Sequence, residues 1–366
     1  HGFRMTNTLV WLRNDLRMKD NPLFDYVIKN KRRILPVFVI DSNNNLGPSS
    51  KWWLYKSIKS LSNSMNDNLL VLDGETEVII KQLIKDYRIE EILWGRRYNP
   101  EDVAIDRDIQ KFAKNQSVEV KIFETSLLAN PSEILKKDGT PFRVYTHFYK
   151  QKYQDLKFES LVYNNNQIQF LPINQSNSIN SVESKMLEKN ENWYKKFEKY
   201  WNPGEEGAHK KLKSFIEFGI DGYSDGRNRP DKNHVSMLSP HLRFGEISPQ
   251  QIITDLDISN NNDAEIFYKE LVWREFSHHL LYHFPQIVSQ NLQNKFDNFP
   301  WILNKDHLKK WQRGKTGFPI VDAGMRQLWE TGYMHNRVRM IVGSFLVKNL
   351  LIDWRHGRDW FNYTLV

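Results

Sequence analysis

Short apolar runs alternate with longer amphipathic segments over the first 130 residues, and this alternation limits the fold more than any other feature. The runs are β-branched or aromatic and continuously apolar, as expected of parallel strands covered on both faces. They span 8–12, 34–40, 69–72, 91–95 and 118–124. Helical periodicity fills 21–30, 51–66, 76–87 and 101–115. The pattern predicts an α/β domain with a doubly wound parallel sheet, which binds ligands beyond the carboxyl ends of its strands.

Strand signals fade from about residue 192, and helical patterns replace them. Ser248 and Pro249 form a typical helix start, and Gly332 follows a helix end. We therefore expect an α/β domain over 5–130 and an all-α domain over 192–366. The Asn-, Ser- and Gln-rich segment 131–191 is predicted to be an interdomain linker, partly ordered where it touches the domains. The helices of the second domain are expected at 207–220, 248–256, 264–284, 320–332 and 336–363.

Composition narrows the class of protein. The chain has 366 residues, with 52 Lys and Arg against 44 Asp and Glu, and this basic excess favours a polyanionic partner. The absence of cysteine excludes disulfides, thiolate zinc sites and cysteine nucleophiles. No GxGxxG, HExxH, GxSxG or P-loop motif is present, so neither a metal site nor a hydrolase is predicted. No apolar run is long enough to span a bilayer, and we expect a soluble, cytoplasmic protein.

Three stretches carry residues suited to binding chemistry. In HVSMLSPHLRFGEI (234–247), the serine hydroxyls and backbone amides before a helix suit a diphosphate, although a serine cap explains them equally well. In ELVWREF (270–276), Glu270, Trp273 and Arg274 share one helical turn and suit a base and its phosphate, or form an ordinary ion-paired amphipathic helix. In YMHNRVRM (333–340), an asparagine and two arginines lie close in sequence to Trp329, with Trp354 and Trp360 following.

The sequence resembles the photolyase/cryptochrome family in these three stretches. The resemblance extends to LVWLRNDLRMKDNP near the start and to WQRGKTGFPIVDAGMRQLWETGYMHNRVRM at 311–340. The resemblance runs from about residue 7 to the last residue and is densest over 234–361. The MHNRVRM variant is most similar to cyclobutane pyrimidine dimer photolyases, whereas (6-4) photolyases carry paired histidines near this place. A light-driven DNA photolyase is therefore the expected function.

The resemblance implies that FAD binds in the helical domain. It places the FAD phosphates at Tyr223, Ser236, Met237, Leu238, Ser239 and Arg274. It places the flavin against Asn336 and Arg339. The wall of the lesion pocket is implied at Glu270, Trp273, Asn336, Arg337 and Met340.

The resemblance also implies roles for these residues. Trp273 would stack on a flipped base, Glu270 would bind the polar edge of the dimer and stabilise its radical anion, and Arg337 would bind lesion or backbone charge. One turn of the helix at 336–340 would face the flavin and the next would face the lesion. The electron that splits the dimer would come from photoexcited reduced FAD.

The resemblance also implies functional residues outside the FAD and lesion sites. Trp301 and Trp354 match the outer and middle members of the family's electron-carrying tryptophan chain. An antenna pigment is expected in the α/β domain: a reduced folate, methenyltetrahydrofolate, or alternatively 8-hydroxy-5-deazaflavin. Tyr98 and Glu101 follow a strand and are candidate contacts for it. DNA containing pyrimidine dimers is the expected partner, and a monomer the expected state.

Two departures from the family pattern leave alternatives open. The sequence stops at Val366, whereas the family continues, so either a tail is omitted or the chain is truncated with weakened flavin binding. Asn349 stands where many relatives have Asp, which removes a charge near the flavin. The alternatives are a cryptochrome-like FAD blue-light photoreceptor without repair activity, or a basic DNA-binding protein without flavin. The joint presence of Glu270, Trp273, Asn336, Arg337 and Met340 favours repair.

Overall fold

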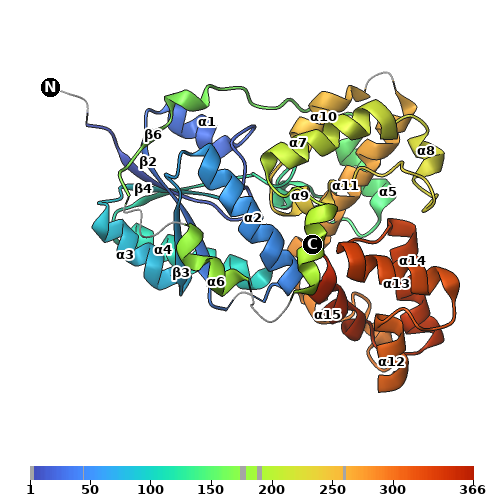
Figure 1. The fold of residues 1–366 in the computed structure, drawn as a ribbon. Helices are drawn as coiled ribbons and strands as arrows, with labels where there is room; N and C mark the ends of the chain where they lie inside the picture. The colour runs from blue at the N-terminus through green and yellow to red at the C-terminus, as the bar shows by residue number, and fades with distance from the viewer. Residues whose placement is uncertain (1–3, 44, 174–178, 188–191, 259–260) are drawn as a thin grey trace.

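The protein is described by a computed structural model over residues 4–43, 45–173, 179–187, 192–258 and 261–366. A parallel sheet lies at one end of the molecule and a helical domain at the other (Figure 1). The central strands follow the order β3-β2-β1-β4-β5, and every pair is parallel. The predicted doubly wound sheet is thus confirmed. The strands are β1 (Asn7–Trp11), β2 (Arg33–Asp41), β3 (Leu70–Gly74), β4 (Glu91–Gly95) and β5 (Glu119–Phe123).

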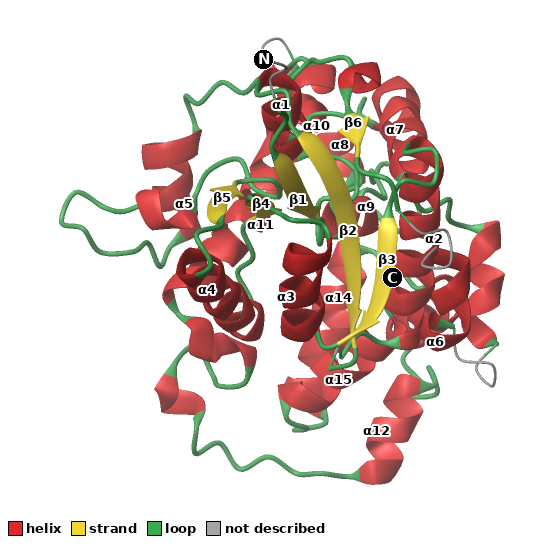
Figure 2. Cartoon of the chain, turned by 90° about the vertical axis from the view of Figure 1, so that its left-hand side faces the viewer, coloured by secondary structure: helices red, strands yellow, loops and turns green. Residues whose placement is uncertain are grey.

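Helices cover both faces of the sheet (Figure 2). The side chains of α1 (Pro22–Lys29) and α2 (Pro48–Ser64) share one core with Val10 and Val71 of the sheet. Those of α3 (Thr76–Asp86) and α4 (Pro100–Asn115) share a second core with alternate strand residues such as Leu9 and Leu35. Successive strand residues point to opposite faces, which is why continuously apolar runs were needed to fill both cores.

The strand order reverses beside β1. The chain passes from β1 to β2 and β3 on one side, and then returns to place β4 on the other side. Trp11 at the end of β1 is therefore aligned with Val37 of β2 and with Trp94 of β4. The carboxyl ends of β1 and β4 form the switch point at which such sheets usually hold a ligand.

The segment between the domains is partly built into both. Residues Gln169–Phe170 form a short strand, β6, that pairs with the start of β2. Earlier in the segment, Phe142, Phe148 and Tyr153 are buried in the core of the helical domain, around α5 (Tyr145–Phe148). A polar composition does not reveal these contacts, because a few aromatic anchors are enough to fix the segment.

The second domain is helical throughout its described residues. The predicted caps are present: the Ser248 hydroxyl accepts the Gln251 N–H at 2.9 Å, and Gly332 ends a helix with a φ of 69°. In the described part of the chain, every helix is too short or too polar to cross a membrane. The main helices are α7 (Glu205–Ser214), α8 (Tyr223–Gly226), α9 (Ser239–Arg243), α10 (Pro249–Leu256), α11 (Asn262–His283), α12 (Lys305–Gln312), α13 (Pro319–Thr331), α14 (Asn336–Ser344) and α15 (Trp354–Thr364).

The helical run expected at 336–363 is broken in the middle. Helix α14 passes into a π turn at Phe345–Asn349, and Leu351 then adopts a left-handed φ of 56°. The Asp353 carboxylate accepts the Arg355 N–H at 2.9 Å and so starts α15. An aspartate one residue before a helix is the local signal for this restart.

Helix α11 carries a buried acid, Glu275, whose side chain ties the helix to the chain after β5. Its carboxylate accepts the N–H groups of Leu128 at 2.7 Å and Ala129 at 3.2 Å. Burial raises the pKa of Glu275 to about 8, and the nearby Arg274 charge offsets only part of this. At neutral pH the folded protein therefore holds this carboxyl in its protonated form.

This raised pKa predicts a pH-dependent stability. An unfolded glutamate is ionised above about pH 4.3, so between that pH and about 8 only the folded state binds the proton, and the free energy of unfolding falls as pH rises. Glu275→Gln keeps an acceptor for the two N–H groups and should stabilise the protein at pH 8.5 by several kcal/mol. The gain should be smaller at pH 5.5. Urea unfolding at both values measures it, and an equal effect at the two pH values would refute the assignment.

Candidate functional site

A cavity of about 360 Å³ lies where α9, the α13–α14 turn, α14 and the end of α15 meet. Its size falls within the range of small-molecule sites, roughly 300–1,000 Å³. Segments widely separated in sequence contribute to it, so tertiary packing creates the site. It is lined by Ser239, Pro240, Arg243, Gly332, Tyr333, Arg339, Phe361, Asn362, Leu365 and Val366.

Two arginines give the cavity its charge. Arg243 Nη1 donates to the Ser50 hydroxyl at 2.7 Å, and Arg339 Nε donates to the Met334 carbonyl at 2.7 Å while its guanidinium lies over the Tyr333 ring. Desolvation by the surrounding protein lowers the pKa of both groups, although Arg243 remains exposed. No carboxylate side chain is among the lining residues, and within the described ranges neither arginine forms a salt bridge. The cavity therefore suits an anionic ligand that also carries an aromatic ring.

Contacts between the domains hold the α15 wall of the cavity. At the start of α2, the Ser49 hydroxyl donates to the Thr364 carbonyl at 2.8 Å, and the Ser50 hydroxyl donates to the Leu365 carbonyl at 3.0 Å. A Cβ at Gly332 would lie 2.8 Å from side-chain atoms of Phe197 and Val366, so the turn before α14 requires glycine for space as well as for its positive φ. The last residues of the chain are thereby fixed beside α14.

The predicted FAD residues divide into cavity-lining and supporting groups. Ser239 and Arg339 line the cavity. Tyr223 is buried edge-on against Phe215 and Phe267. Residues Ser236, Met237 and Leu238 form the tight turn before α9: the Ser236 hydroxyl accepts the Leu238 N–H at 3.3 Å, Met237 has a φ of 57°, and Leu238 is buried. Left-handed backbone at a non-glycine residue is strained and is typical of binding loops.

Arg274 and Asn336 lie outside the cavity lining. Arg274 Nη1 donates to the Ser126 carbonyl at 2.7 Å, and Nη2 lies 3.4 Å from the Leu242 carbonyl, so this side chain braces α9 from behind. Asn336 is exposed at the first position of α14. The sequence analysis missed Arg243, although Arg243 follows Ser239 by four residues and lies on the same face of α9. It also missed Tyr333 and the four cavity-lining residues from α15 and the chain end.

The expected lesion-binding residues gather on a second, exposed surface, here called the lesion surface: Glu270, Trp273, Arg337 and Met340. Two adjacent residues after α8 connect its halves. Arg227 forms an ion pair with Glu270 of α11, and the Asn228 side chain accepts from Arg337 Nε of α14 at 2.8 Å. Trp273 remains 46% exposed and Met340 57% exposed. An acidic group, a cation and two apolar faces are therefore available to one ligand.

Helix α14 separates the cavity from the lesion surface. Arg339 points into the cavity, whereas Asn336 and Met340 are exposed and Arg337 lies close to Met340 Sδ at 3.5 Å. Met340 lies one turn after Asn336 and Arg337, whereas Arg337 and Arg339 lie about 200° apart around the helix. Arg339 and the Arg337–Met340 pair therefore lie on opposite sides of α14, and Asn336 lies between them. The sequence analysis instead expected successive turns of the helix to face the two sites.

The indoles near this stretch pack against one another. Trp329 of α13 stacks on Trp193 at 4.2 Å between ring centroids and is parallel to Trp360 of α15 at 5.7 Å. Tyr363 extends the stack beside Trp360 at 5.7 Å. These rings join α13 to α15 and to Trp193 at the start of the helical domain.

Trp301 and Asn291 line a smaller cavity of about 230 Å³. Trp354 is not among its lining residues, but the Trp354 indole N–H donates to the Asn291 side chain at 3.0 Å. The guanidinium groups of Arg355 and Arg358 lie over the Trp354 ring. The structure therefore brings the two tryptophans into one region. Asn349 is exposed at the end of the π turn before α15.

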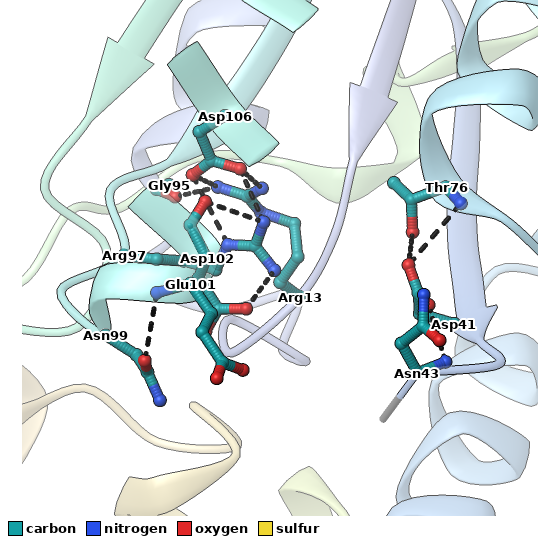
Figure 3. Close-up of polar contacts among 10 residues, drawn as sticks. All are labelled: Arg13, Asp41, Asn43, Thr76, Gly95, Arg97, Asn99, Glu101, Asp102 and Asp106. Carbon is teal, nitrogen blue, oxygen red and sulfur yellow. Dashed lines mark hydrogen bonds and ion pairs between the residues drawn. The ribbon is translucent and has the colours of Figure 1, made fainter. Parts of the chain in front are cut away.

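At the carboxyl edge of the sheet, the switch point between β1 and β4 is filled by charged side chains (Figure 3). Arg13 Nη1 pairs with Asp106 at 2.8 Å, Arg97 pairs with the same carboxylate, and both guanidinium groups lie over Trp11. Burial alone would raise the pKa of Asp106, but the charges of Arg13 and Arg97 outweigh it and lower that pKa. This group closes the place where the fold usually holds a ligand.

The two predicted antenna residues differ in their surroundings. Tyr98 is buried, its hydroxyl donates to the Glu124 carboxylate, and burial raises its pKa. Glu101 is exposed in the first turn of α4, and its carboxylate points away from Arg13 and Asp106 (Figure 3). The described side chains therefore leave Glu101 accessible and Tyr98 engaged in the interior.

A two-domain fold with a cavity lined by arginine and aromatic side chains is suited to a protein that binds a nucleotide cofactor. Comparison with known proteins identifies the family. The family model described as DNA photolyase matches residues 8–167, and that described as FAD binding domain of DNA photolyase matches 267–366. A deoxyribodipyrimidine photo-lyase of Agrobacterium fabrum is 39% identical over 98% of this chain and 76% of its own length.

A solved structure agrees with that match. The crystal structure of a bacterial class III photolyase from Agrobacterium tumefaciens superimposes with a TM-score of 0.92 at 38% identity, covering 100% of this chain and 77% of that chain. Cryptochrome-2 of Arabidopsis thaliana is 31% identical over 98% of this chain and 62% of its own length. The chain belongs to the photolyase/cryptochrome family.

Proposed function

We propose that the protein is a deoxyribodipyrimidine photolyase, a lyase that uses light to split cyclobutane pyrimidine dimers in DNA. The observation that carries this proposal is the arrangement of two sites on the two faces of α14. A cationic cavity lies on one face and the lesion surface on the other, so a cofactor and a flipped dimer would be held close together. A single chain forms both sites, which supports action as a monomer; gel filtration would test that state.

The cavity residues fit FAD. Arg243 and Arg339 would hold the diphosphate, the amide and hydroxyl of Ser239 would add donors at the start of α9, and Tyr333 and Phe361 offer faces for the ring system. Met237 and Arg274 would support α9 from outside the cavity. When bound, reduced FAD supplies upon excitation the electron that opens the cyclobutane ring and recovers it afterwards.

The lesion surface would bind the dimer after it leaves the duplex. A dimer stacks poorly, so flipping it costs less than flipping two normal bases. Trp273 would stack on one ring, Met340 would contact the other, and Arg337 would neutralise nearby backbone charge. The Glu270 carboxylate, now paired with Arg227, would accept the N–H groups on the polar edge of the dimer, and Asn336 would lie between the lesion and the cofactor.

The test is a repair assay with the purified protein. We expect a flavin absorption band, and loss of dimers from an irradiated oligonucleotide under blue light but not in the dark. Binding to DNA should weaken steeply with salt, because phosphate contacts release counterions. A protein that stays colourless after incubation with FAD, or that binds FAD and leaves dimers intact, would contradict the proposal.

We also propose an antenna pigment on the α/β domain, methenyltetrahydrofolate, with 8-hydroxy-5-deazaflavin as the alternative. Because Arg13, Asp106 and Arg97 fill the switch point, we propose that the pigment binds beside it, on the exposed side of α4 near Glu101, with Tyr98 as a buried support. The same absorption spectrum distinguishes the two pigments. A spectrum with flavin bands alone would argue against any bound antenna.

We propose that Trp301 and Trp354 carry electrons from the surface to oxidised FAD. Asn291 contacts both, since it lines a cavity with Trp301 and accepts the Trp354 indole N–H, and the order with Trp301 outermost follows the family resemblance. Trp301→Phe should slow the photoreduction of oxidised flavin several-fold, because phenylalanine is much harder to oxidise, and should leave repair by chemically pre-reduced enzyme intact. An unchanged rate of flavin photoreduction, followed by absorption during illumination, would exclude this route.

A further inference from the structure

Trp273, the exposed indole of the lesion surface, is backed by a second ring from the segment between the domains. Tyr145 of α5 lies parallel to it, with 3.8 Å between ring centroids and an interplanar angle of 4°. Tyr149 continues the stack behind Tyr145 at 6.0 Å and 18°. Tyr145 thus covers one face of the indole. Trp273 is nevertheless 46% exposed, and this exposed surface lies on the part of the side chain that Tyr145 does not cover.

Tyr145 is itself fixed on α11. Its hydroxyl donates to the Lys269 carbonyl at 2.7 Å, one helical turn before Trp273. Phe276 meets the edges of both rings, with centroid distances of 5.9 Å to each. Three contacts from one helix therefore hold Tyr145, and through it the indole, in a single orientation.

We propose that Tyr145 is a positioning residue for substrate binding: it holds Trp273 with one free face, ready to stack on one base of a flipped dimer. This inference rests on the proposed photolyase function. An unsupported surface indole would lose rotational freedom when a base arrives, whereas a pre-stacked indole has already lost it. The covered face also restricts the platform to a single base, so the second pyrimidine of the dimer must be recognised by other groups.

Three variants separate ring stacking from hydrogen bonding and from general packing. Tyr145→Phe keeps the ring and should bind dimer-containing DNA nearly as wild type does. Tyr145→Leu removes the ring face and should lose about 3- to 10-fold in affinity for dimer-containing DNA, the range typical of one aromatic pair. Tyr282→Leu, which replaces an exposed tyrosine of α11 itself, is the matched control and should change nothing.

The affinities of dimer-containing and undamaged duplexes are measured for each variant, together with FAD content and thermal midpoint. In a double variant with Trp273→Ala, loss of Tyr145 should add no further weakening, because it acts through that indole. A wild type without preference for dimers would overturn the function itself. If the wild type prefers dimer-containing DNA and Tyr145→Leu keeps its affinity for that DNA, only the proposed role of Tyr145 is overturned. The same conclusion follows if Tyr145→Leu loses affinity for damaged and undamaged DNA equally.

Discussion

Replacing Trp273 by alanine is expected to lower the affinity for dimer-containing DNA by about 5- to 150-fold, because stacking on an aromatic side chain contributes roughly 1–3 kcal/mol per base. Affinity for undamaged duplex should stay close to wild type, since no base leaves the helix to meet the indole. The side chain is suited to this selectivity, because its free face is exposed while Tyr145 fixes the other. Fluorescence anisotropy with the two oligonucleotides measures both affinities.

The salt dependence and a graded variant serve as controls for this effect. Trp273→Phe retains a smaller ring and should fall between wild type and the alanine variant. The slope of affinity against salt should be the same in all three proteins, because Trp273 contributes no phosphate contact and releases no counterions. Equal losses for damaged and undamaged DNA, or a shallower salt slope, would show that the indole acts in general DNA binding.

The sheet could be predicted from the sequence because its signals are local. Each strand is a continuous apolar run, and burial on both faces demands that run whichever partners the strand later finds. Helix starts such as Ser248 and ends such as Gly332 are equally local, and both lie where they were predicted. The break at Leu351 was missed because a left-handed leucine has no sequence signal of its own.

The cavity could be predicted only in part. Its residues come from α9, from the turn before α14 and from the last residues of the chain. These segments meet through tertiary contacts, among them the bonds by which Ser49 and Ser50 of α2 hold the Thr364 and Leu365 carbonyls. No short-range pattern encodes that contact. The resemblance supplied Ser239 and Arg339, but it did not reveal Arg243 or the chain-end residues facing them.

The partners of the lesion surface were equally hidden. Glu270 and Trp273 were recognisable from their spacing on one helix turn. Their contacts, Arg227 and Tyr145, lie just after α8 and on α5, and both helices pack against α11 only in the folded chain. The residues expected to touch a ligand could therefore be proposed from the sequence, whereas the residues that contact them could not.

Arg243 is a cavity-lining cation that has no carboxylate partner within the described ranges. Its side chain is exposed, and its guanidinium donates to the neutral Ser50 hydroxyl. A diphosphate in the cavity would supply a counter-ion and would accept charge-assisted hydrogen bonds from the guanidinium.

Arg243→Met, which keeps length and apolar bulk, should therefore weaken FAD binding and leave the stability of the protein without FAD largely unchanged. Without FAD, the variant should unfold at a temperature close to that of wild type, because the Arg243 side chain is exposed and within the described ranges has no salt bridge to lose. Its affinity for FAD should fall by about 10- to 150-fold, the effect of losing one charge-assisted hydrogen bond of roughly 1.5–3 kcal/mol. Arg107→Ala removes an exposed cation from α4 and should change neither property. Calorimetric titration of apoprotein with FAD, paired with thermal unfolding, would reject the assignment if Arg243→Met bound FAD as tightly as wild type.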